Sequence, residues 1–237
     1  MCGRYTLATP DPAAVRARFP VGEAVEIRRR YNVAPADDVL AVTTGREGRP
    51  RGELLKWGLV PSWADDQSSR LKMINARVET VAERPAFRSA FERFRCLIIA
   101  DGFYEWSAPA DGSRKRAFHI TRSDHKLFAF AGLWSIWRPQ NDGEASKLRS
   151  CTILTTAANR AVAPLHDRMP VILERDAERA WLDPATPREL LEEMLAPLPA
   201  EQTSATAVGP AVNDARYDGP ECLVPAGEAA DSQASLF

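Results

Sequence analysis

Residues 95–106 read Arg-Cys-Leu-Ile-Ile-Ala-Asp-Gly-Phe-Tyr-Glu-Trp, and they contain the strongest strand signal in the chain. Positions 95–100 form a short, mostly apolar run, which is typical of a buried strand. Positions 103–106 predict a second strand directly after it. Further strands are expected over 39–44, 53–60, 117–121, 127–133, 149–156 and 169–173. Because the strands are short and few helices separate them, the pattern favours an α+β domain built on curved, largely antiparallel sheets.

Helical features are confined to a few short segments. Residues 84–94 place Phe87, Phe91 and Phe94 at i, i+4 and i+7, which is the spacing of one helix face. The other helices are expected over 10–19, 175–182 and 187–195. The remaining segments predict a hairpin turn over 46–50, loops over 61–72 and 196–220, and disorder after about residue 225.

The composition is that of an ordinary globular protein. The chain has 237 residues, of which 45% are hydrophobic and 27% charged, enough for a sizeable core. No run of about 18 apolar residues predicts a membrane span, and the first residues lack the blocks of a signal peptide, so a cytoplasmic location is expected. The cysteines are widely spaced and form no Cys-x-x-Cys pair, which argues against a metal site. Cys96 and Cys151 lie in apolar runs and are expected to be buried thiols.

A net charge of −1 conceals a strong asymmetry along the chain. Residues 174–237 carry 4 Lys/Arg and 13 Asp/Glu, whereas residues 1–173 carry 27 Lys/Arg and 19 Asp/Glu. Arginine dominates the basic residues, with 26 Arg against 5 Lys. A basic, arginine-rich body favours a polyanionic ligand such as nucleic acid. The alternative is a codon bias toward arginine, and the charge alone does not decide between them.

Cys2 directly follows Met1. Removal of Met1 would expose an α-amine and a thiol on adjacent carbons, a pair that can condense with an aldehyde and close a five-membered thiazolidine ring. The amine has an ordinary pKa of about 7.7–8.0, so part of it is neutral and nucleophilic at pH 7. No internal cysteine can react in this way, because its nitrogen belongs to an amide. The alternative is that a cysteine stands at position 2 by chance.

Two further residues are candidates for acid–base chemistry. Glu105 lies between two aromatic residues after an apolar strand, and such surroundings raise the pKa of a carboxyl group. His166 lies in a loop beside Asp167 and Arg168, and a histidine near a carboxylate is a common general acid or base. The alternatives are an outward-facing strand residue for Glu105 and a surface loop residue for His166.

Four more side chains can serve binding rather than proton transfer. Asn75 can orient a reactive group through its amide, or it can be an ordinary turn residue. Arg4, Arg77 and Arg168 can hold phosphates, or they can be solvated surface charges.

Seven segments together resemble one family. They are MCGRYTL (1–7), YNVAP (31–35), WGLVPSWA (57–64), INARVET (74–80), FYEW (103–106), LTTAAN (154–159) and HDRMPVIL (166–173). In this order they are similar to the SOS-response-associated peptidase (SRAP) family of abasic-site-processing proteins. The resemblance runs from residue 1 to about 185. It implies an SRAP domain over 1–196, with a barrel-like core flanked by short helices, and a partly ordered C-terminal extension over 197–237.

The resemblance also implies a function. Cys2, freed of Met1, would attack the ring-opened aldehyde of an abasic site in single-stranded DNA and form a thiazolidine DNA–protein crosslink. It assigns catalytic roles to Cys2, Asn75, Glu105 and His166, and DNA contacts to Arg4, Pro35, Trp63, Arg77, Thr155 and Arg168. It further implies no metal or organic cofactor, no membrane association, a monomer, and a nucleoid-associated location; replication-fork partners are not specified.

Two other functions stay open on the residues alone. Cys2 with His166 and Glu105 can make a cysteine peptidase, acting on peptides or on its own Met1. The chain can also be a non-catalytic module that binds single-stranded DNA. A peptidase nucleophile need not be terminal, whereas the nitrogen of a thiazolidine must be; a binding module gives no covalent product.

Overall fold

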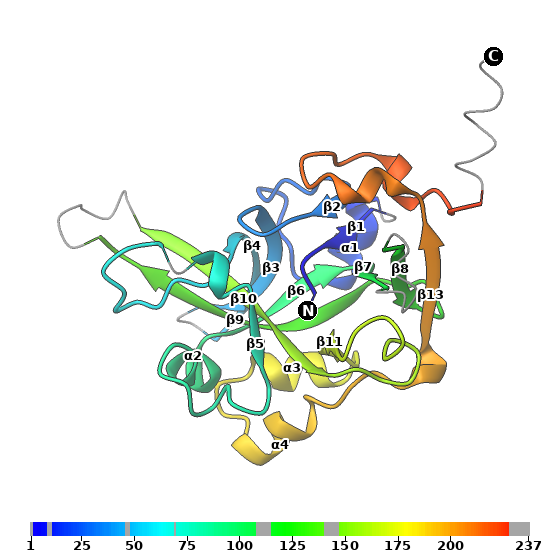
Figure 1. The fold of residues 1–237 in the computed structure, drawn as a ribbon. Helices are drawn as coiled ribbons and strands as arrows, with labels where there is room; N and C mark the ends of the chain where they lie inside the picture. The colour runs from blue at the N-terminus through cyan, green and yellow to red at the C-terminus, as the bar shows by residue number, and fades with distance from the viewer. Residues whose placement is uncertain are drawn as a thin grey trace.

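The computed structural model describes residues 2–8, 11–45, 48–68, 70–107, 115–139 and 147–227. Its core is a closed ring of strands in the order β10-β4-β3-β6-β9, with β9 returning to β10 (Figure 1). The strands of the ring are β3 (Asp38–Thr44), β4 (Pro50–Trp57), β6 (Arg95–Ala100), β9 (Phe128–Trp137) and β10 (Leu148–Ala157). Within the ring only β10 and β4 run parallel; the other neighbours are antiparallel. The expected α+β class with curved, largely antiparallel sheets and a barrel-like core is confirmed.

Three short strands extend the ring. β5 (Asn75–Arg77) and β11 (Arg168–Pro170) both pair with β10, and β12 (Ile172–Leu173) pairs with β9. Thr155 of β10 lies opposite Arg77 on one side and Pro170 on the other. The C-terminal end of β10 therefore joins two segments that lie far apart in the sequence.

A second sheet packs beside the ring in the order β13-β8-β7-β1-β2. Its strands are β1 (Tyr5–Leu7), β2 (Arg30–Val33), β7 (Gly102–Trp106), β8 (Ala117–Arg122) and β13 (Thr203–Val208). β1, at the start of the chain, lies between β2 and β7. β13 pairs with β8 along its whole length, so part of the segment expected to be a loop over 196–220 is an edge strand.

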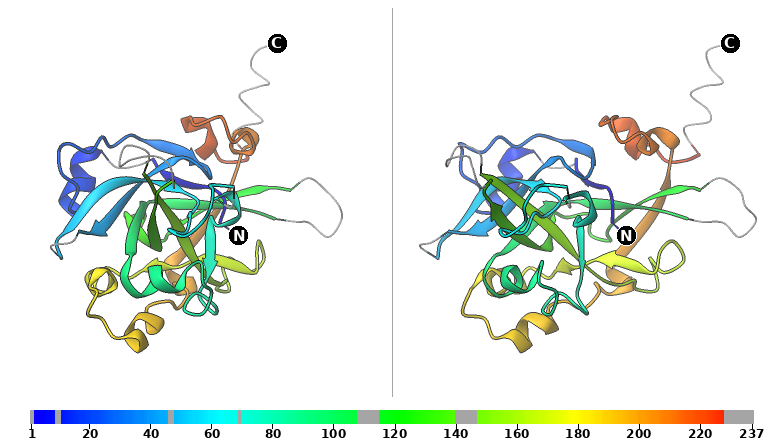
Figure 2. Two further views of the ribbon diagram at one scale, coloured as in Figure 1. Left: turned by 90° about the vertical axis from the view of Figure 1, so that its left-hand side faces the viewer. Right: turned by 60° about the vertical axis from the view of Figure 1, so that its left-hand side comes forward.

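The helices are short and lie outside the sheets (Figure 2). They are α1 (Pro12–Arg18), α2 (Arg88–Arg93), α3 (Ala177–Leu182) and α4 (Arg188–Glu193), with 3₁₀ turns η1 (Arg70–Lys72), η3 (Ala200–Gln202), η4 (Pro210–Asn213) and η5 (Pro220–Leu223). In both views α3 and α4 lie together on one side, and the last turns of the chain lie on the opposite side. No helix in the described part of the chain is long and apolar enough to cross a membrane.

The expected helices are confirmed, but α2 is shorter than the pattern predicts. Residues 80–87 form turns, and the helix ends at Arg93. Phe87 and Phe91 are buried as expected, whereas Phe94 leaves the helical conformation (φ −125°, ψ 58°) and is 40% exposed. Of the hairpin turn expected over 46–50, positions 46 and 47 lie outside the described residues, and of the disorder expected after about 225, positions 228–237 do.

A buried polar network ties β1 to β7 and β8. The Thr6 hydroxyl donates to Asp101 Oδ1 at 2.5 Å and lies 3.0 Å from His119 Nε2. The backbone N–H of Ala8 donates to Asp101 Oδ2 at 2.7 Å. Gly102 leaves room for the network, because a Cβ on it would lie 2.1 Å from His119 Nε2 and 2.9 Å from Thr6 Oγ1.

Gly102→Ala is therefore expected to destabilise the protein. The added methyl group must displace the buried His119 ring, and overpacking of this kind costs about 1–3 kcal/mol. Urea unfolding should show a lower midpoint with an unchanged slope. Gly22→Ala is the control, because its Cβ would meet nothing within 4 Å. Equal midpoints for the two variants would mean that the network tolerates the methyl group.

His119 should make the protein sensitive to acid. Burial lowers the pKa of His119 to about 4, with a smaller opposing effect of Asp101. Because the unfolded chain binds this proton near pH 6.5 and the folded chain near pH 4, stability falls as the pH falls between these values, by up to about 3 kcal/mol. His119→Gln should flatten that part of the curve of unfolding free energy against pH. Parallel curves for wild type and His119→Gln would refute the prediction.

Candidate active site

Cys2 lies just before β1 and is fully buried. Its carbonyl oxygen accepts a hydrogen bond of 2.8 Å from Asn75 Nδ2, and its Sγ lies 3.8 Å from the carbonyl oxygen of Arg4. Asn75 is the first residue of β5, which β10 holds in place. The start of the chain is thus fixed to the ring by one side-chain amide from a residue 73 positions away.

The environment of the Cys2 thiol keeps it protonated. Burial raises the pKa of Cys2, and the charge of Glu105 raises it further, while the positive N-terminus opposes the rise. The thiolate is the nucleophilic form of a cysteine. The thiol therefore requires a neighbouring group that removes its proton as it reacts.

Glu105 lies on β7 and is 4% exposed. Side chains two apart on a strand share a face, so Glu105 points to the same side as the core residue Phe103. Tyr5 pairs with Phe103, and the N–H of Tyr104 donates to the Arg4 carbonyl at 3.0 Å, which brings this part of β7 alongside the N-terminal residues. Burial raises the pKa of Glu105, against the opposing positive charges of the N-terminus and His166. Glu105 can therefore both donate and accept a proton closer to neutral pH than an exposed glutamate.

His166 lies in the loop between β10 and β11 and is partly buried. The backbone N–H of Arg168 donates to His166 Nδ1 at 2.9 Å, and Asp167 Oδ1 lies 2.8 Å from the same nitrogen. The first contact needs an unprotonated Nδ1, whereas the second is favourable only when Nδ1 carries a proton. The loop thus offers a partner for either protonation state of the ring.

Of the two polar atoms of the Asn75 amide, only the nitrogen has a hydrogen-bond partner among the described residues. Its nitrogen donates to Cys2, but among the described residues its buried Oδ1 has no hydrogen-bond partner. A buried acceptor of this kind is costly unless a ligand or another group completes it. It is therefore suited to accept a hydrogen bond from a group that arrives beside Cys2.

Two of the three predicted phosphate-binding arginines have protein partners. Arg168 forms two hydrogen bonds to the Glu79 carboxylate, of 2.6 and 2.9 Å, and one of 2.5 Å to the carbonyl of Thr155. Arg4 donates to Asn32 Oδ1 at 3.0 Å and to the Val212 carbonyl at 2.9 Å.

Arg77, the third of these arginines, differs from the other two. It ends β5 at the surface, and its side chain is exposed. The structure therefore holds two of the cations in fixed positions and leaves this one accessible.

The other predicted DNA contacts come from three different segments of the chain. Thr155 is buried where β5, β10 and β11 meet, and its hydroxyl lies 3.4 Å from the Ala76 carbonyl. Pro35 is partly buried in the turn after β2, next to Ala36 with a φ of 74°. Trp63 is 65% exposed in the loop after β4.

Sequence reasoning missed two residues that position the site. Glu79 holds the guanidinium of Arg168, and Asn32 holds that of Arg4. Each lies inside one of the segments that carry the family resemblance, INARVET for Glu79 and YNVAP for Asn32. The resemblance assigned neither residue a function. Asn32 also donates to the carbonyl oxygens of Asp214 and Tyr217, at 2.9 and 2.8 Å.

The comparisons with known proteins agree with one another. The family model described as "SOS response associated peptidase (SRAP)" matches residues 1–215. The abasic site processing protein YoaM of Bacillus subtilis (strain 168) is 40% identical over 229 residues, covering 94% of this chain and 97% of that protein. The abasic site processing protein YedK of Escherichia coli (strain K12) is 32% identical over 198 residues, covering 83% of this chain and 84% of that protein. A crystal structure of a protein from Bacteroides thetaiotaomicron, 22% identical, has the same fold, with a TM-score of 0.80 over 94% of this chain and 99% of the other.

The matched region contains Cys2, β5 with Asn75, β7 with Glu105 and the loop that carries His166. Identity of 40% over nearly the whole length of a relative supports the same family. On these grounds the chain belongs to the SOS response associated peptidase (SRAP) family.

Proposed function

We propose that this protein processes abasic sites in single-stranded DNA by bonding covalently to the ring-opened aldehyde through Cys2. Two relatives that match over most of the chain are named abasic site processing proteins. The observation that carries the proposal is the position of Cys2. It is held by Asn75 at the start of the chain and interacts electrostatically with the buried carboxyl group of Glu105.

The crosslinking reaction needs no reactant other than the protein and the abasic DNA. The α-amine of Cys2 adds to the aldehyde carbon and water leaves, which gives an imine. The sulfur then adds to the imine carbon, and the thiol proton passes to the nitrogen, which gives a thiazolidine. The product equals protein plus DNA minus one water. Ring closure also removes the imine, which would otherwise promote β-elimination and strand scission.

The neighbouring side chains suit the proton transfers. An abasic deoxyribose is mostly a closed hemiacetal, and opening it needs a proton donor and a proton acceptor. Glu105, with its raised pKa, serves as the acid for ring opening and for loss of water. His166 serves as the second proton carrier, supported in either state by Asp167 or the Arg168 N–H. The unused oxygen of Asn75 accepts a hydrogen bond from the α-amine of Cys2.

The proposal requires that Met1 is removed. Either Cys2, Glu105 and His166 remove it themselves, or a general methionine aminopeptidase does. The terminal position of Cys2 favours this function over a peptidase acting on other proteins, because a peptidase nucleophile need not be terminal whereas the nitrogen of a thiazolidine must be. The expectations of a monomer, of no cofactor and of a nucleoid-associated location stay predictions.

Mass spectrometry tests the proposal. Purified protein is incubated with a single-stranded oligonucleotide that bears one abasic site, and with the same oligonucleotide without the lesion. The expected product has the summed mass minus water, survives heating and forms only with the lesion. Loss of Met1 without any adduct on abasic DNA would overturn the proposal and favour the peptidase or simple binding alternatives.

A further inference from the structure

The last part of the described chain, residues 209–227, packs beside the start of the chain. It contains η4 and η5, and in Figure 1 its orange and red ribbon lies next to β1 and β2. The family model matches residues 1–215, so η5 lies beyond the matched region. Neither the sequence motifs nor the proposed function gives this segment a role. We call residues 209–227 the C-terminal clasp.

The C-terminal clasp covers the face of the second sheet that is turned away from the proposed site. Side chains alternate between the two faces of a strand, so Tyr104 and Trp106 of β7 lie on the face opposite to Glu105. Tyr104 is fully buried in a small apolar cluster with Val212 of η4 and Cys222 of η5. Trp106 packs against the same cluster. The clasp and the proposed catalytic carboxyl group therefore lie on opposite faces of β7.

The turn η4 is attached both to β7 and to the residues before β1. Arg4 donates to a carbonyl oxygen of η4 at 2.9 Å, and its guanidinium lies 5.9 Å from the centroid of the Trp106 ring. Trp106 Nε1 donates in turn to Asn213 Oδ1 at 2.8 Å. Arg4 lies two positions after Cys2, and Trp106 directly follows Glu105. The turn therefore holds a close neighbour of each of these two proposed catalytic residues.

Asn32 joins Arg4 to the backbone of the C-terminal clasp. The residue is buried, and its Oδ1 accepts a hydrogen bond of 3.0 Å from Arg4. Its Nδ2 donates to the carbonyl oxygens of Asp214 and Tyr217, at 2.9 and 2.8 Å. The oxygen of the Asn32 amide thus contacts the start of the chain, while its nitrogen contacts the clasp. A displacement of the clasp would therefore break contacts that hold Arg4 in place.

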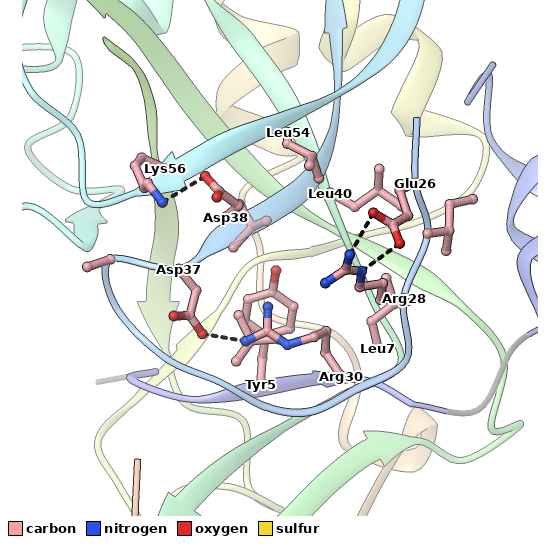
Figure 3. Close-up of a pocket in the computed structure, with 14 residues that line it drawn as sticks. Tyr5, Leu7, Glu26, Arg28, Arg30, Asp37, Asp38, Leu40, Leu54 and Lys56 are labelled. Atoms are coloured by element: carbon pink, nitrogen blue, oxygen red, sulfur yellow. Dashed lines mark hydrogen bonds and ion pairs between the residues drawn. The ribbon is translucent and has the colours of Figure 1, made fainter. Parts of the chain in front are cut away.

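Asp218 fastens the C-terminal clasp to β2, which is an edge strand of the second sheet. The outer backbone N–H groups of an edge strand have no partner strand. Asp218 Oδ1 accepts hydrogen bonds from two of them, those of Tyr31 and Asn32, at 2.6 and 2.8 Å. Asp218 Oδ2 pairs with Arg30, which also pairs with Asp37 at 2.5 Å (Figure 3). One carboxylate thus ties three consecutive residues of β2 to the clasp.

We propose that the C-terminal clasp keeps the proposed site in its reactive geometry, with Asp218 and Asn213 as positioning residues. This inference rests on the function proposed for Cys2 and Glu105. Both positioning residues act through the neighbours of the catalytic residues and not on the reacting atoms. From the back of the sheet they fix the strand that carries Glu105 and the residues that follow Cys2. Because a displacement of about 1 Å in a reacting group can cost about 10²-fold in rate, loosening the clasp should slow the crosslinking step.

Single-turnover crosslinking to an oligonucleotide with one abasic site tests the inference. Asp218→Ala should lower the maximal rate about tenfold and leave the oligonucleotide concentration for half of that rate unchanged. Asp218→Asn should recover most of the rate, because its amide oxygen can still accept from both backbone N–H groups. Asn213→Ala, which removes the acceptor of Trp106, should lower the maximal rate several-fold. The control Glu221→Ala removes an exposed carboxylate that contacts the Tyr217 hydroxyl, and it should react like the wild type.

Alkylation of the cysteines by iodoacetamide gives a second measurement, which needs no DNA. A buried thiol reacts only when the structure around it opens, and Cys2 and Cys96 are both fully buried. Peptide mass spectrometry measures the two alkylation rates separately in one sample. In Asp218→Ala the rate at Cys2 should rise several-fold, while the rate at Cys96, on β6 of the ring, should stay the same. A general loss of stability would raise both rates together.

Three results would overturn the inference. The first is an equal maximal rate for Asp218→Ala and Glu221→Ala. The second is a higher oligonucleotide concentration for half the maximal rate with the maximal rate unchanged, which would make the C-terminal clasp a binding element. The third is an equal rise in alkylation at Cys2 and Cys96. If the wild type forms no crosslink at all, the proposed function is rejected, and the alkylation rates alone then decide whether the clasp holds Cys2.

Discussion

Cys2→Ala is expected to abolish the heat-stable adduct with abasic DNA. Without the thiol, the α-amine can form only an imine, which water reverses. Cys2→Ser should behave in the same way, because a hydroxyl group closes the ring far less readily than a sulfur. Both variants should cut more of the DNA at the lesion than the wild type does, since an imine that is not closed promotes β-elimination.

Denaturing gels that resolve adduct, intact strand and cleaved strand measure all three species in one reaction. The control is Cys96→Ala, which removes another buried free thiol, on β6. It should keep the adduct. A heat-stable adduct of normal yield in Cys2→Ala would show that another group captures the aldehyde, and the proposed chemistry would then be wrong.

Glu105→Gln is expected to slow crosslinking by about 10²–10⁴-fold, the usual contribution of a positioned acid or base. Glutamine keeps the size of the side chain but cannot give up or accept the proton. The crosslinking rate of the wild type should also depend on pH in a direction that the Glu105 pKa determines. Because burial raises the pKa of Glu105, its acid form persists toward neutral pH and is lost as the pH rises through that raised value. The wild-type rate should therefore fall on the alkaline side, and the variant should lack this fall.

Single-turnover crosslinking rates across the pH range test this prediction. Glu178→Gln is a matched control, because burial also raises the pKa of Glu178, which lies on α3 and pairs with Arg18 at 2.5 Å. Its rate and pH profile should equal those of the wild type. A Glu105→Gln rate within a few-fold of the wild type, with the alkaline fall intact, would exclude Glu105 as the acid.

The parts of the fold that the sequence predicts are those with a strong local pattern. Strands β6, β9 and β10 contain continuous apolar runs, and their positions agree with the expected runs. β5 has three residues, Asn-Ala-Arg, and is a strand only because β10 pairs with it. β13 (Thr-Ser-Ala-Thr-Ala-Val) has no continuous apolar run, and its hydrogen-bond partners come from β8. A strand that forms only because a distant segment pairs with it is difficult to predict from its own residues.

The same distinction separates the residues of the site. Cys2 and Glu105 are conspicuous from their immediate neighbours, one by its position behind Met1 and the other by its aromatic flanks. The contact between Asn75 and Cys2 joins residues far apart in the chain, and no spacing predicts it. The partners of Arg4 likewise come from residues 32 and 212, so its fixed position emerges only when both ends of the chain fold together.

β10 has one more consequence for the proposed DNA complex. It is a single strand held by β4, β5, β9 and β11, with Thr155 where β5 and β11 pair with it and Arg149, which pairs with Glu53, toward its other end. These two residues are six positions apart, or about 20 Å at 3.3 Å per residue. Because neighbouring strands hold β10 extended, the distance between these two residues stays the same whatever DNA sequence the proposed complex contains.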